Sequence, residues 1–316
     1  MAPQPGPRRA RRSDSTRGDL DFGPFLLLAT LEGLVTAATL ALTAIGLSLV
    51  FGVMRVVNVA HGEFFMVGAV VAWFVADAVG SVVPGLPAAG FLAALVVSPL
   101  VAAAIAVVLD RLVLRRLGYE PEAVIVATIG FGYVLQQGAL SFYGPEARAV
   151  AAPFDLRLQF PWFGYSGYKL AVVALSALVI AAVWLVLART RIGLVMRATQ
   201  WDRETATAFG IDVDRVYALV FGLGAGLAAV AAVLVVPISQ AHYLMGGDPL
   251  LLSFIVVIIG GLGSFRGTIV AALLIGLSDG IISVFFSPTL AKILATLVVA
   301  LVLVFRPQGL FGRRTA

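Results

Sequence analysis

Apolar runs of membrane-spanning length alternate with short polar stretches along most of this chain. The runs cover 24–52, 64–83, 88–109, 123–143, 168–188, 216–237 and most of 250–305. Windows of about 20 apolar residues with few charges are typical of transmembrane helices. Strands of a membrane barrel would instead alternate over about 10 residues. The pattern predicts an all-α, polytopic helical membrane protein with eight to ten transmembrane segments, some of them broken.

Two interruptions stand out because they combine glycine or polar residues with apolar surroundings. The first is 52–63. The stretch 24–60 is too short for two full spans, so it holds either one span plus a half-helix or two short tilted spans. The second is GGLGSFRG at 260–267. Backbone that leaves a helix at membrane depth must line a cavity or be buried in protein. Paired interruptions in the two halves of a transporter therefore point to the substrate path.

Composition and charge fix the environment and the orientation. The chain is 60% hydrophobic, and its mean hydropathy of +1.02 requires most of it to face lipid. The positive-inside rule places 111–116, 189–215 and 306–314 in the cytoplasm. Residues 1–22 carry five Arg, and we expect a disordered basic cytoplasmic tail. A tail on that side requires an even number of crossings before Arg111. The remainder, 23–316, is expected to form one membrane domain in a bacterial plasma membrane.

Residues 189–215 form the one long polar island between apolar runs of spanning length. Gln200–Phe209 is predicted to be a short helix with Trp201, Thr205 and Phe209 on one face. Gly210 follows its C-terminus, where a left-handed turn is favoured. Asp212 or Asp214 suits the N-cap of the following span. The island is either an ordinary helix lying in the membrane interface or a loop presented to a partner.

The polar turn in 55–63 and the isolated acids are the other candidates for function. Asn58, His61 and Glu63 either bond to one another or line a substrate path. The only other His is His242, so a metal site has too few ligands. GGLGSFRG is not a phosphate-binding loop, because neither Lys of the chain stands in a Gly-Lys-Ser/Thr sequence. We therefore predict neither enzyme activity nor a cofactor for this chain.

Four blocks of sequence resemble the branched-chain amino acid permeases of ABC transporters, on the LivH rather than the LivM side. ETATAFG (204–210) is similar to the Glu-Ala-Ala-x-x-x-Gly loop of ABC importer permeases, with Thr205 in place of the first Ala. The wider island resembles the same loop in that family. The other matching blocks are GLSLVFGVMRVVNVAHGEFFMVGA (46–69), GGLGSFRGTIVAALLIGLSD (260–279) and FRPQGLFG (305–312).

The resemblance implies a permease subunit of an ABC importer for branched-chain or related amino acids. Its partners would be a homologous second permease, two ATP-binding subunits that bind the ATP, and an extracytoplasmic solute-binding protein. The island would be the coupling helix that docks on the ATPase. The docking residues would be Arg197, Trp201, Glu204, Thr205, Ala206 and Gly210. The path would be lined by Asn58, His61, Gly62, Glu63, Gly260, Gly261, Gly263 and Asp279, the last at a position that is usually acidic in the family.

Other functions remain open from the sequence alone. Permeases for urea and short amides resemble this family closely. An ion-coupled secondary transporter or a passive channel would also be polytopic, but neither needs a docking loop. Residues 55–63 and 260–267 are expected to lie close together in the membrane interior, at the contact with the partner permease. Whether the two permeases are identical is not specified by the sequence.

Overall fold

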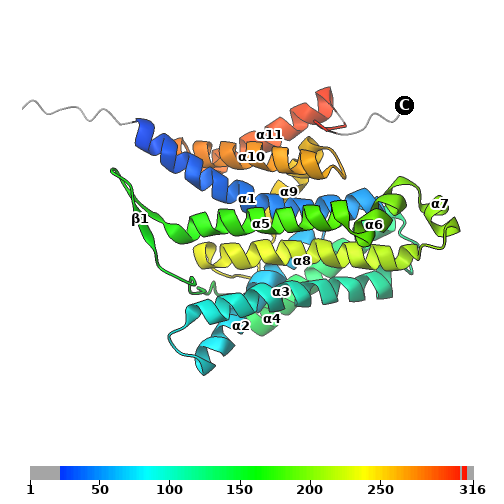
Figure 1. Ribbon diagram of the computed structural model, residues 1–316, viewed down its shortest axis with the longest axis horizontal. Coiled ribbons are helices and arrows are strands. Elements are labelled where there is room, and N and C mark those ends of the chain that lie inside the picture. The colour runs from blue at the N-terminus through cyan, green and yellow to red at the C-terminus, as the bar shows by residue number, and fades with distance from the viewer. Residues whose placement is uncertain (1–21, 307, 312–316) are drawn as a thin grey trace, which may run out of the picture.

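The computed structural model describes residues 22–306 and 308–311, and these form a bundle of long helices (Figure 1). Eight of the helices in this part are long and apolar enough to cross a membrane, and α9 is a shorter apolar helix. The prediction of eight to ten segments is therefore confirmed. The elements are α1 (Phe22–Met54), α2 (His61–Val82), α3 (Pro87–Leu109) with the π-helical turn η1 (Asp110–Leu114), α4 (Pro121–Tyr143), β1 (Arg157–Gln159), β2 (Gly164–Ser166), α5 (Gly167–Arg189), α6 (Arg191–Trp201), α7 (Arg203–Ala208), α8 (Val213–Ser239), α9 (Gly247–Gly260), α10 (Phe265–Phe285) and α11 (Pro288–Phe305).

Local sequence signals begin several of these helices. Pro121 and Pro288 occupy first-turn positions, where the missing N–H has no intrahelical partner in any case. The side chains of Asp212, Ser264 and Ser287 accept hydrogen bonds from the first-turn amides of α8, α10 and α11. Of the two predicted caps for α8, Asp212 is therefore the one used.

The N-terminal region differs from both sequence-based alternatives. Residues 22–54 form one helix of 33 residues, about 50 Å long, and 55–60 are not helical. Three helices, α1 to α3, precede Arg111. The prediction of an even number of crossings is wrong, because 24–60 contributes a single span. The basic tail itself lies outside the described residues, except for Phe22, which begins α1. The start of α1 lies at the opposite end of the bundle from α6 and α7 (Figure 1).

The two ends of the bundle differ in charge. The island, the α3–α4 turn and the end of α11 lie at one end, and the β1–β2 hairpin and the start of α1 lie at the other (Figure 1). Described basic residues at the island end are Arg55, Arg111, Arg115, Arg116, Arg189, Arg191, Arg197, Arg203, Arg215, Arg266 and Arg306. Those in the other half are Arg148, Arg157, Lys169 and Lys292. The positive-inside rule places the island end in the cytoplasm.

Helices α1 and α8 form the centre of the bundle. Their most apolar windows are 67% and 78% buried, against 6% for α11 and 11% for α5. Glycines allow the central helices to approach closely: a Cβ on Gly46 would lie 2.5 Å from the carbonyl oxygen of Gly224. A Cβ on Gly68 of α2 would meet the backbone of Ala229 at the same distance. Close contact through small residues is how helices associate within a membrane.

A short β-hairpin is the one addition to the all-α prediction. Strands β1 and β2 pair antiparallel, with Leu158 opposite Tyr165, at the outer end of the bundle. An isolated bridge joins Arg148 to Ala241, so the loop after α4 contacts the loop after α8. The hairpin lies within the segment 144–167, which the sequence marks only as polar.

Candidate translocation path and coupling loop

Helix α2 begins inside the bundle rather than at its cytoplasmic end. After Met54 the backbone turns at Arg55, which has a φ of +57°, and residues 55–60 run back along α1. His61, the first residue of α2, is fully buried, and its Nε2 lies 2.9 Å from the carbonyl oxygen of Thr43. Thr43 is eleven residues before Met54, about 16 Å inside the end of α1. A carbonyl only accepts, so Nε2 carries the proton.

Helix α9 begins at the same depth. It has 14 residues and is about 21 Å long, so it reaches only part of the way through the membrane. Residues 240–246 turn back from the end of α8 to reach its start. A Cβ on Gly62 would lie 2.7 Å from Cβ of Leu250 and closer still to the carbonyl oxygen of Gly246. The N-terminal ends of α2 and α9 therefore meet in the interior of the bundle.

The predicted path residues in 58–63 are gathered around this crossing. Asn58 and His61 are almost completely buried, and Glu63 is partly buried. In the described chain, Asn58 Oδ1, His61 Nδ1 and Glu63 Oε2 are buried without a hydrogen-bond partner. The amide of Val59 donates to the hydroxyl of Thr128 on α4. The sequence left open whether these groups bond to one another, and none of these three atoms does so.

The glycines of 260–267 occupy a different place. Gly260 ends α9, and 261–264 form the tight turn into α10 at the cytoplasmic end. A Cβ on Gly263 would lie 2.7 Å from Cα of Gly52, and a Cβ on Gly260 would meet the backbone of Gly267 at 2.5 Å. Gly261 packs against Gly309 near the end of the chain.

The expected contact between 55–63 and 260–267 is therefore corrected by the structure. Gly62 packs against Gly246, at the start of α9, while the glycine turn at its other end packs against Gly52 of α1. The physical reason is that α9 is a half-span: only its first turn lies at the depth of Gly62. Gly260, Gly261 and Gly263 lie at the cytoplasmic end of the bundle.

Asp279 belongs to a charged group that the sequence did not reveal as a group. Lys292 Nζ on α11 lies 2.6 Å from Asp248 Oδ2 in the first turn of α9. Asp279 on α10 interacts electrostatically with both. The signal available in the sequence was a lone Lys within an apolar run, but its partner is 44 residues away.

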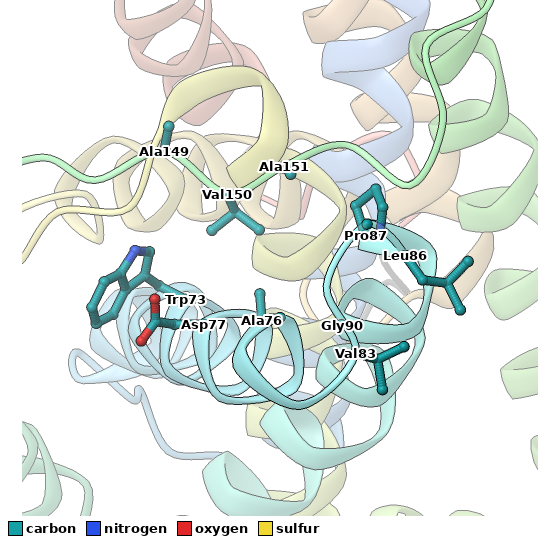
Figure 2. Close-up of a pocket in the computed structure, with 12 residues that line it drawn as sticks. Trp73, Ala76, Asp77, Val83, Leu86, Pro87, Gly90, Ala149, Val150 and Ala151 are labelled. Atoms are coloured by element: carbon teal, nitrogen blue, oxygen red, sulfur yellow. The ribbon is translucent and has the colours of Figure 1, made fainter.

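A separate cavity of about 250 Å³ lies at the outer end, between α2, the α2–α3 turn and 149–151. Figure 2 shows Trp73 and Asp77 side by side on α2, with Val150 pointing toward them from the opposite wall. The guanidinium of Arg148 stacks 4.4 Å from the Trp73 ring. None of the residues predicted to line the path lines this cavity.

The island consists of two helices, not the single helix predicted over Gln200–Phe209. Helix α6 ends at Trp201, and Asp202 adopts an extended conformation with a φ of −152°. Its carboxylate accepts hydrogen bonds from the amides of Glu204 and Thr205 and from the Thr205 hydroxyl. An N-cap aspartate competes with helix continuation in this way. The Thr205 hydroxyl is the largest of the causes that lower the pKa of Asp202 below its ordinary value.

The candidate docking residues divide into exposed and inward-facing groups. Trp201 is 72% exposed, and Phe209, which follows α7, is 84% exposed. Glu204 lies in the first turn of α7 and is exposed. Ala206, in contrast, is only 3% exposed and packs inward. Arg197 donates a hydrogen bond to the carbonyl oxygen of Leu187, which ties α6 to the end of α5.

Gly210 has the left-handed conformation predicted for it, with a φ of +83°. Its amide donates to Thr207, and the amide of Ile211 donates to Ala206. These two bonds form a Schellman motif that closes α7. A Cβ on Gly210 would meet no other atom within 4 Å, so the conformation rather than space requires glycine.

The island contacts four parts of the membrane bundle. The Arg203 guanidinium lies 5.8 Å from the ring centroid of Tyr119, in the α3–α4 turn, and 5.5 Å from that of Tyr217 on α8. Arg55 donates a hydrogen bond to the carbonyl oxygen of Gln200. The Gln200 amide lies against Gly52 and Gly263. The island therefore contacts the ends of α1 and α8, the α3–α4 turn and the α9–α10 turn.

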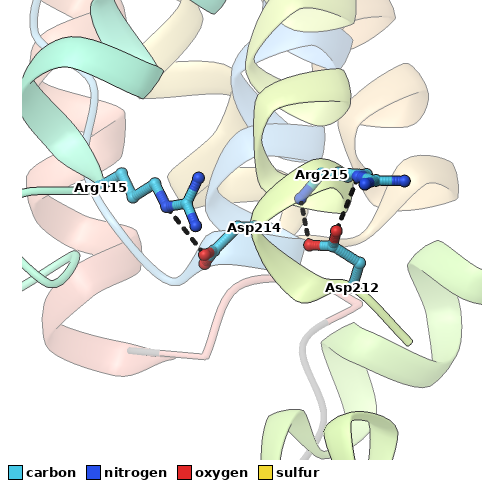
Figure 3. A network of polar contacts seen from close by, with 4 residues as sticks. All are labelled: Arg115, Asp212, Asp214 and Arg215. Carbon is cyan, nitrogen blue, oxygen red and sulfur yellow. Dashed lines mark hydrogen bonds and ion pairs between the residues drawn. The ribbon is translucent and has the colours of Figure 1, made fainter. Parts of the chain in front are cut away.

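Two ion pairs lie at the start of α8, one to the α3–α4 turn and one within the first residues of the helix (Figure 3). Arg115 Nε lies 2.9 Å from Asp214 Oδ2, and Arg215 Nε lies 2.7 Å from Asp212 Oδ2. Both pairs are substantially exposed, so each contributes about 0–1 kcal/mol.

Comparison with known proteins identifies the family. The family described as the permease component of branched-chain amino acid transport systems matches residues 29–305. The chain belongs to this permease family. It is 28% identical over 305 residues to the high-affinity branched-chain amino acid transport permease LivH of Escherichia coli K12, covering 92% of this chain and 96% of that protein. It is also 28% identical over 297 residues to BraD of Pseudomonas aeruginosa, covering 89% and 94%.

An archaeal relative extends the comparison. A probable LivH from Methanocaldococcus jannaschii is 25% identical over 306 residues, covering 92% of this chain and 94% of that protein. The matched residues include the starts of α2 and α9 and the whole island, 189–215. This permease is therefore a multi-pass membrane component of a transport system, and the LivH side of the resemblance seen in its sequence is confirmed.

Proposed function

We propose that this permease is a membrane subunit of an ABC importer that carries branched-chain or related amino acids into the cell. Its partners are a homologous second permease, two ATP-binding subunits and an extracytoplasmic solute-binding protein. ATP binds to the ATPase subunits, and this chain requires no cofactor. The observation that carries the proposal is a helical cytoplasmic loop in which the large aromatic side chains Trp201 and Phe209 are exposed.

The loop 189–215 couples the ATPase to the membrane domain. The cleft of the ATPase takes the exposed side of the loop, which includes Trp201, Glu204 and Phe209. Three other residues hold the loop in shape: Arg197 bonds to Leu187, Ala206 packs inward, and Gly210 closes α7. An apolar side chain that is more than two-thirds exposed on a structured loop is a common mark of an interaction site.

The crossing of α2 and α9 forms the inner wall of the translocation path. Asn58, His61, Gly62 and Glu63 supply buried polar atoms there, and such groups are costly at membrane depth without a partner. The island reaches this wall through Gln200, which lies against the end of α1. Docking movements at the loop therefore alter the wall through α1.

Cross-linking between the loop and the ATPase tests this assignment. The chain contains no Cys, so Phe209→Cys places a single thiol on the proposed docking surface. In the assembled transporter, a thiol-to-amine cross-linker should join it to an ATP-binding subunit. Trp162→Cys, at the tip of the outer hairpin and 60% exposed, is the matched control and should give no such product. Equal cross-linking from both sites, or none from Phe209→Cys in a transporter active in uptake, would contradict the proposal.

The cargo is tested separately. Reconstituted transporter should accumulate leucine, isoleucine and valine, and an excess of urea or acetamide should not compete. Competition by urea together with failure to accumulate leucine would assign the chain to the short-amide permeases instead.

A further inference from the structure

The ion pair between Asp248 and Lys292 lies at membrane depth. Asp248 is twelve residues before the end of α9, and Lys292 is thirteen before the end of α11. Both are therefore about 18–20 Å from the cytoplasmic ends of their helices, within a hydrocarbon layer of about 30 Å. The other pair of this kind, Glu32–Lys169, differs because Glu32 is about 33 Å from the end of α1, near the outer surface.

This pair is not enclosed by its own chain. The side chains of Lys292 and Asp248 are 42% and 65% exposed. A charge that faces lipid at this depth is costly, so such residues face protein or a water-filled cavity. The face formed by the start of α9 and by α11 is therefore covered in the working transporter by water or by the second permease.

Asp248 also lines a cavity. It has a volume of about 390 Å³ and lies between the end of α8, the 240–246 loop, the start of α9 and α2. Its size is in the range of small-molecule sites. Its lining combines apolar residues, among them Phe65, Leu244 and Met245, with the polar residues Ser239, His242 and Asp248. A mixed apolar and polar lining fits an amino acid with an aliphatic side chain.

The start of α9 adds a second attraction for an anion. Its first-turn amides have no partner within the helix and carry the positive end of the helix dipole. The α9 axis begins at this cavity and runs toward the cytoplasm. Discontinuous helices in transporters place such ends against substrate carboxylates.

Lys292 does not line the cavity, but its Nζ lies 2.6 Å from Asp248 Oδ2. We propose that this cavity binds the zwitterionic head of the transported amino acid, with Asp248 pairing with the α-ammonium and the α9 N-terminus and the neighbouring Lys292 taking the α-carboxylate. Asp279 on α10 interacts electrostatically with both residues of the pair. The bound zwitterion replaces the Asp248–Lys292 pair with two pairs, so both protein charges remain compensated. This inference rests on the proposed function and names the substrate-binding residues within it.

Protection of a cavity thiol tests the site directly. Ser239→Cys places the only thiol of this chain in the cavity wall. Its rate of modification by a small methanethiosulfonate reagent is measured in the assembled transporter, without the binding protein, at millimolar ligand. At about twice its dissociation constant, leucine should slow labelling about threefold. Leucinamide lacks the carboxylate and 4-methylpentanoate lacks the ammonium, so neither should protect.

Charge-removing variants identify the residues. Protection by leucine should be lost in Asp248→Asn and in Lys292→Met. It should persist in Glu32→Gln and Lys169→Met, which break the comparable pair near the outer surface. Protection that survives both Asp248→Asn and Lys292→Met, equal protection by all three ligands, or no protection by leucine would overturn the proposal.

The exchanged double variant Asp248→Lys with Lys292→Asp covers the case in which single variants fail to assemble. It keeps an ion pair but reverses it relative to the α9 dipole. If the double variant assembles but leucine does not slow labelling of its thiol, the result supports the site. If it assembles and leucine still slows labelling, the ion pair is purely structural and the proposal is overturned. ATP-driven leucine uptake by the unmodified transporter is recorded in parallel. Leucine uptake without protection of the thiol would contradict only the proposed binding site. Absence of leucine uptake would contradict the proposed function.

Discussion

Gly210 closes α7 in a left-handed conformation, and Gly210→Val is expected to uncouple transport without preventing insertion. The backbone φ of +83° is one that a β-branched residue adopts only with strain. The cost for an ordinary residue is about 1–2 kcal/mol. Because nothing lies within 4 Å of the added Cβ, packing contributes no further penalty. The whole effect therefore comes from the backbone of the loop.

The magnitude follows from the population of the loop that retains its native shape. A penalty of about 1–2 kcal/mol lowers that population about 5- to 30-fold. Phe209 adjoins the glycine and is 84% exposed, so a changed turn displaces this side chain from the docking surface. ATP-driven uptake at matched membrane levels should fall by a similar factor. The assay is initial-rate leucine uptake in proteoliposomes, with thermal unfolding recorded on the same samples.

Gly85→Val is the matched control. Gly85 has a φ of +86° and open space around its Cα, but it lies in the α2–α3 turn at the opposite end of the bundle. Strain should lower thermal stability equally in the two variants, while uptake should fall only with Gly210→Val. Normal uptake in Gly210→Val, or an equal loss in both, would refute the reasoning that the turn sets the coupling surface.

Three further substitutions probe the loop and the helix crossing. Arg203→Gln removes two cation–π contacts of about 0.5–1 kcal/mol each. Proteolysis within the loop should become faster, and uptake should fall several-fold. An unchanged rate of proteolysis would argue against Arg203 as an anchor of the loop. Gly62→Val overpacks the crossing against Leu250 at a cost of about 1–3 kcal/mol, and uptake should be lost, whereas Gly80→Val, in open space on the same helix, should transport normally. Asp202→Ala removes the N-cap of α7, so uptake should fall. The lowered pKa of Asp202 means that the cap is present at neutral pH and is lost only as the pH falls through that lower pKa. The loss of uptake in Asp202→Ala should therefore be the same between about pH 6 and 8, and a pH-dependent loss would contradict the cap.

The spans could be predicted because hydropathy reports directly on the solvent of each segment. Residues 123–143 and 168–188 were predicted within two residues of the helices found. The break at Asp202 was missed because the helical spacing of Trp201, Thr205 and Phe209 outweighed the capping signal. The capping signal was Asp202, followed three residues later by Thr205. The Asp202 carboxylate accepts hydrogen bonds from the amides of Glu204 and Thr205.

Tertiary contacts account for the remaining differences. No local pattern reports that Gly62 packs against Gly246, because the two helix starts are far apart along the chain. The same holds for Asp248 and Lys292, which lie on α9 and α11. The single helix over 22–54 also could not be separated from two short spans, since an apolar run of that length satisfies either arrangement.

The central claim is that this chain transports only when ATPase subunits act on its loop. Leucine uptake is measured in proteoliposomes that contain the chain alone or the complete transporter with its binding protein, after ionophores have collapsed the proton and sodium gradients. The account predicts ATP-dependent accumulation by the complete transporter and none by the chain alone. Accumulation by the isolated chain under an imposed proton or sodium gradient, with no dependence on ATP, would contradict it.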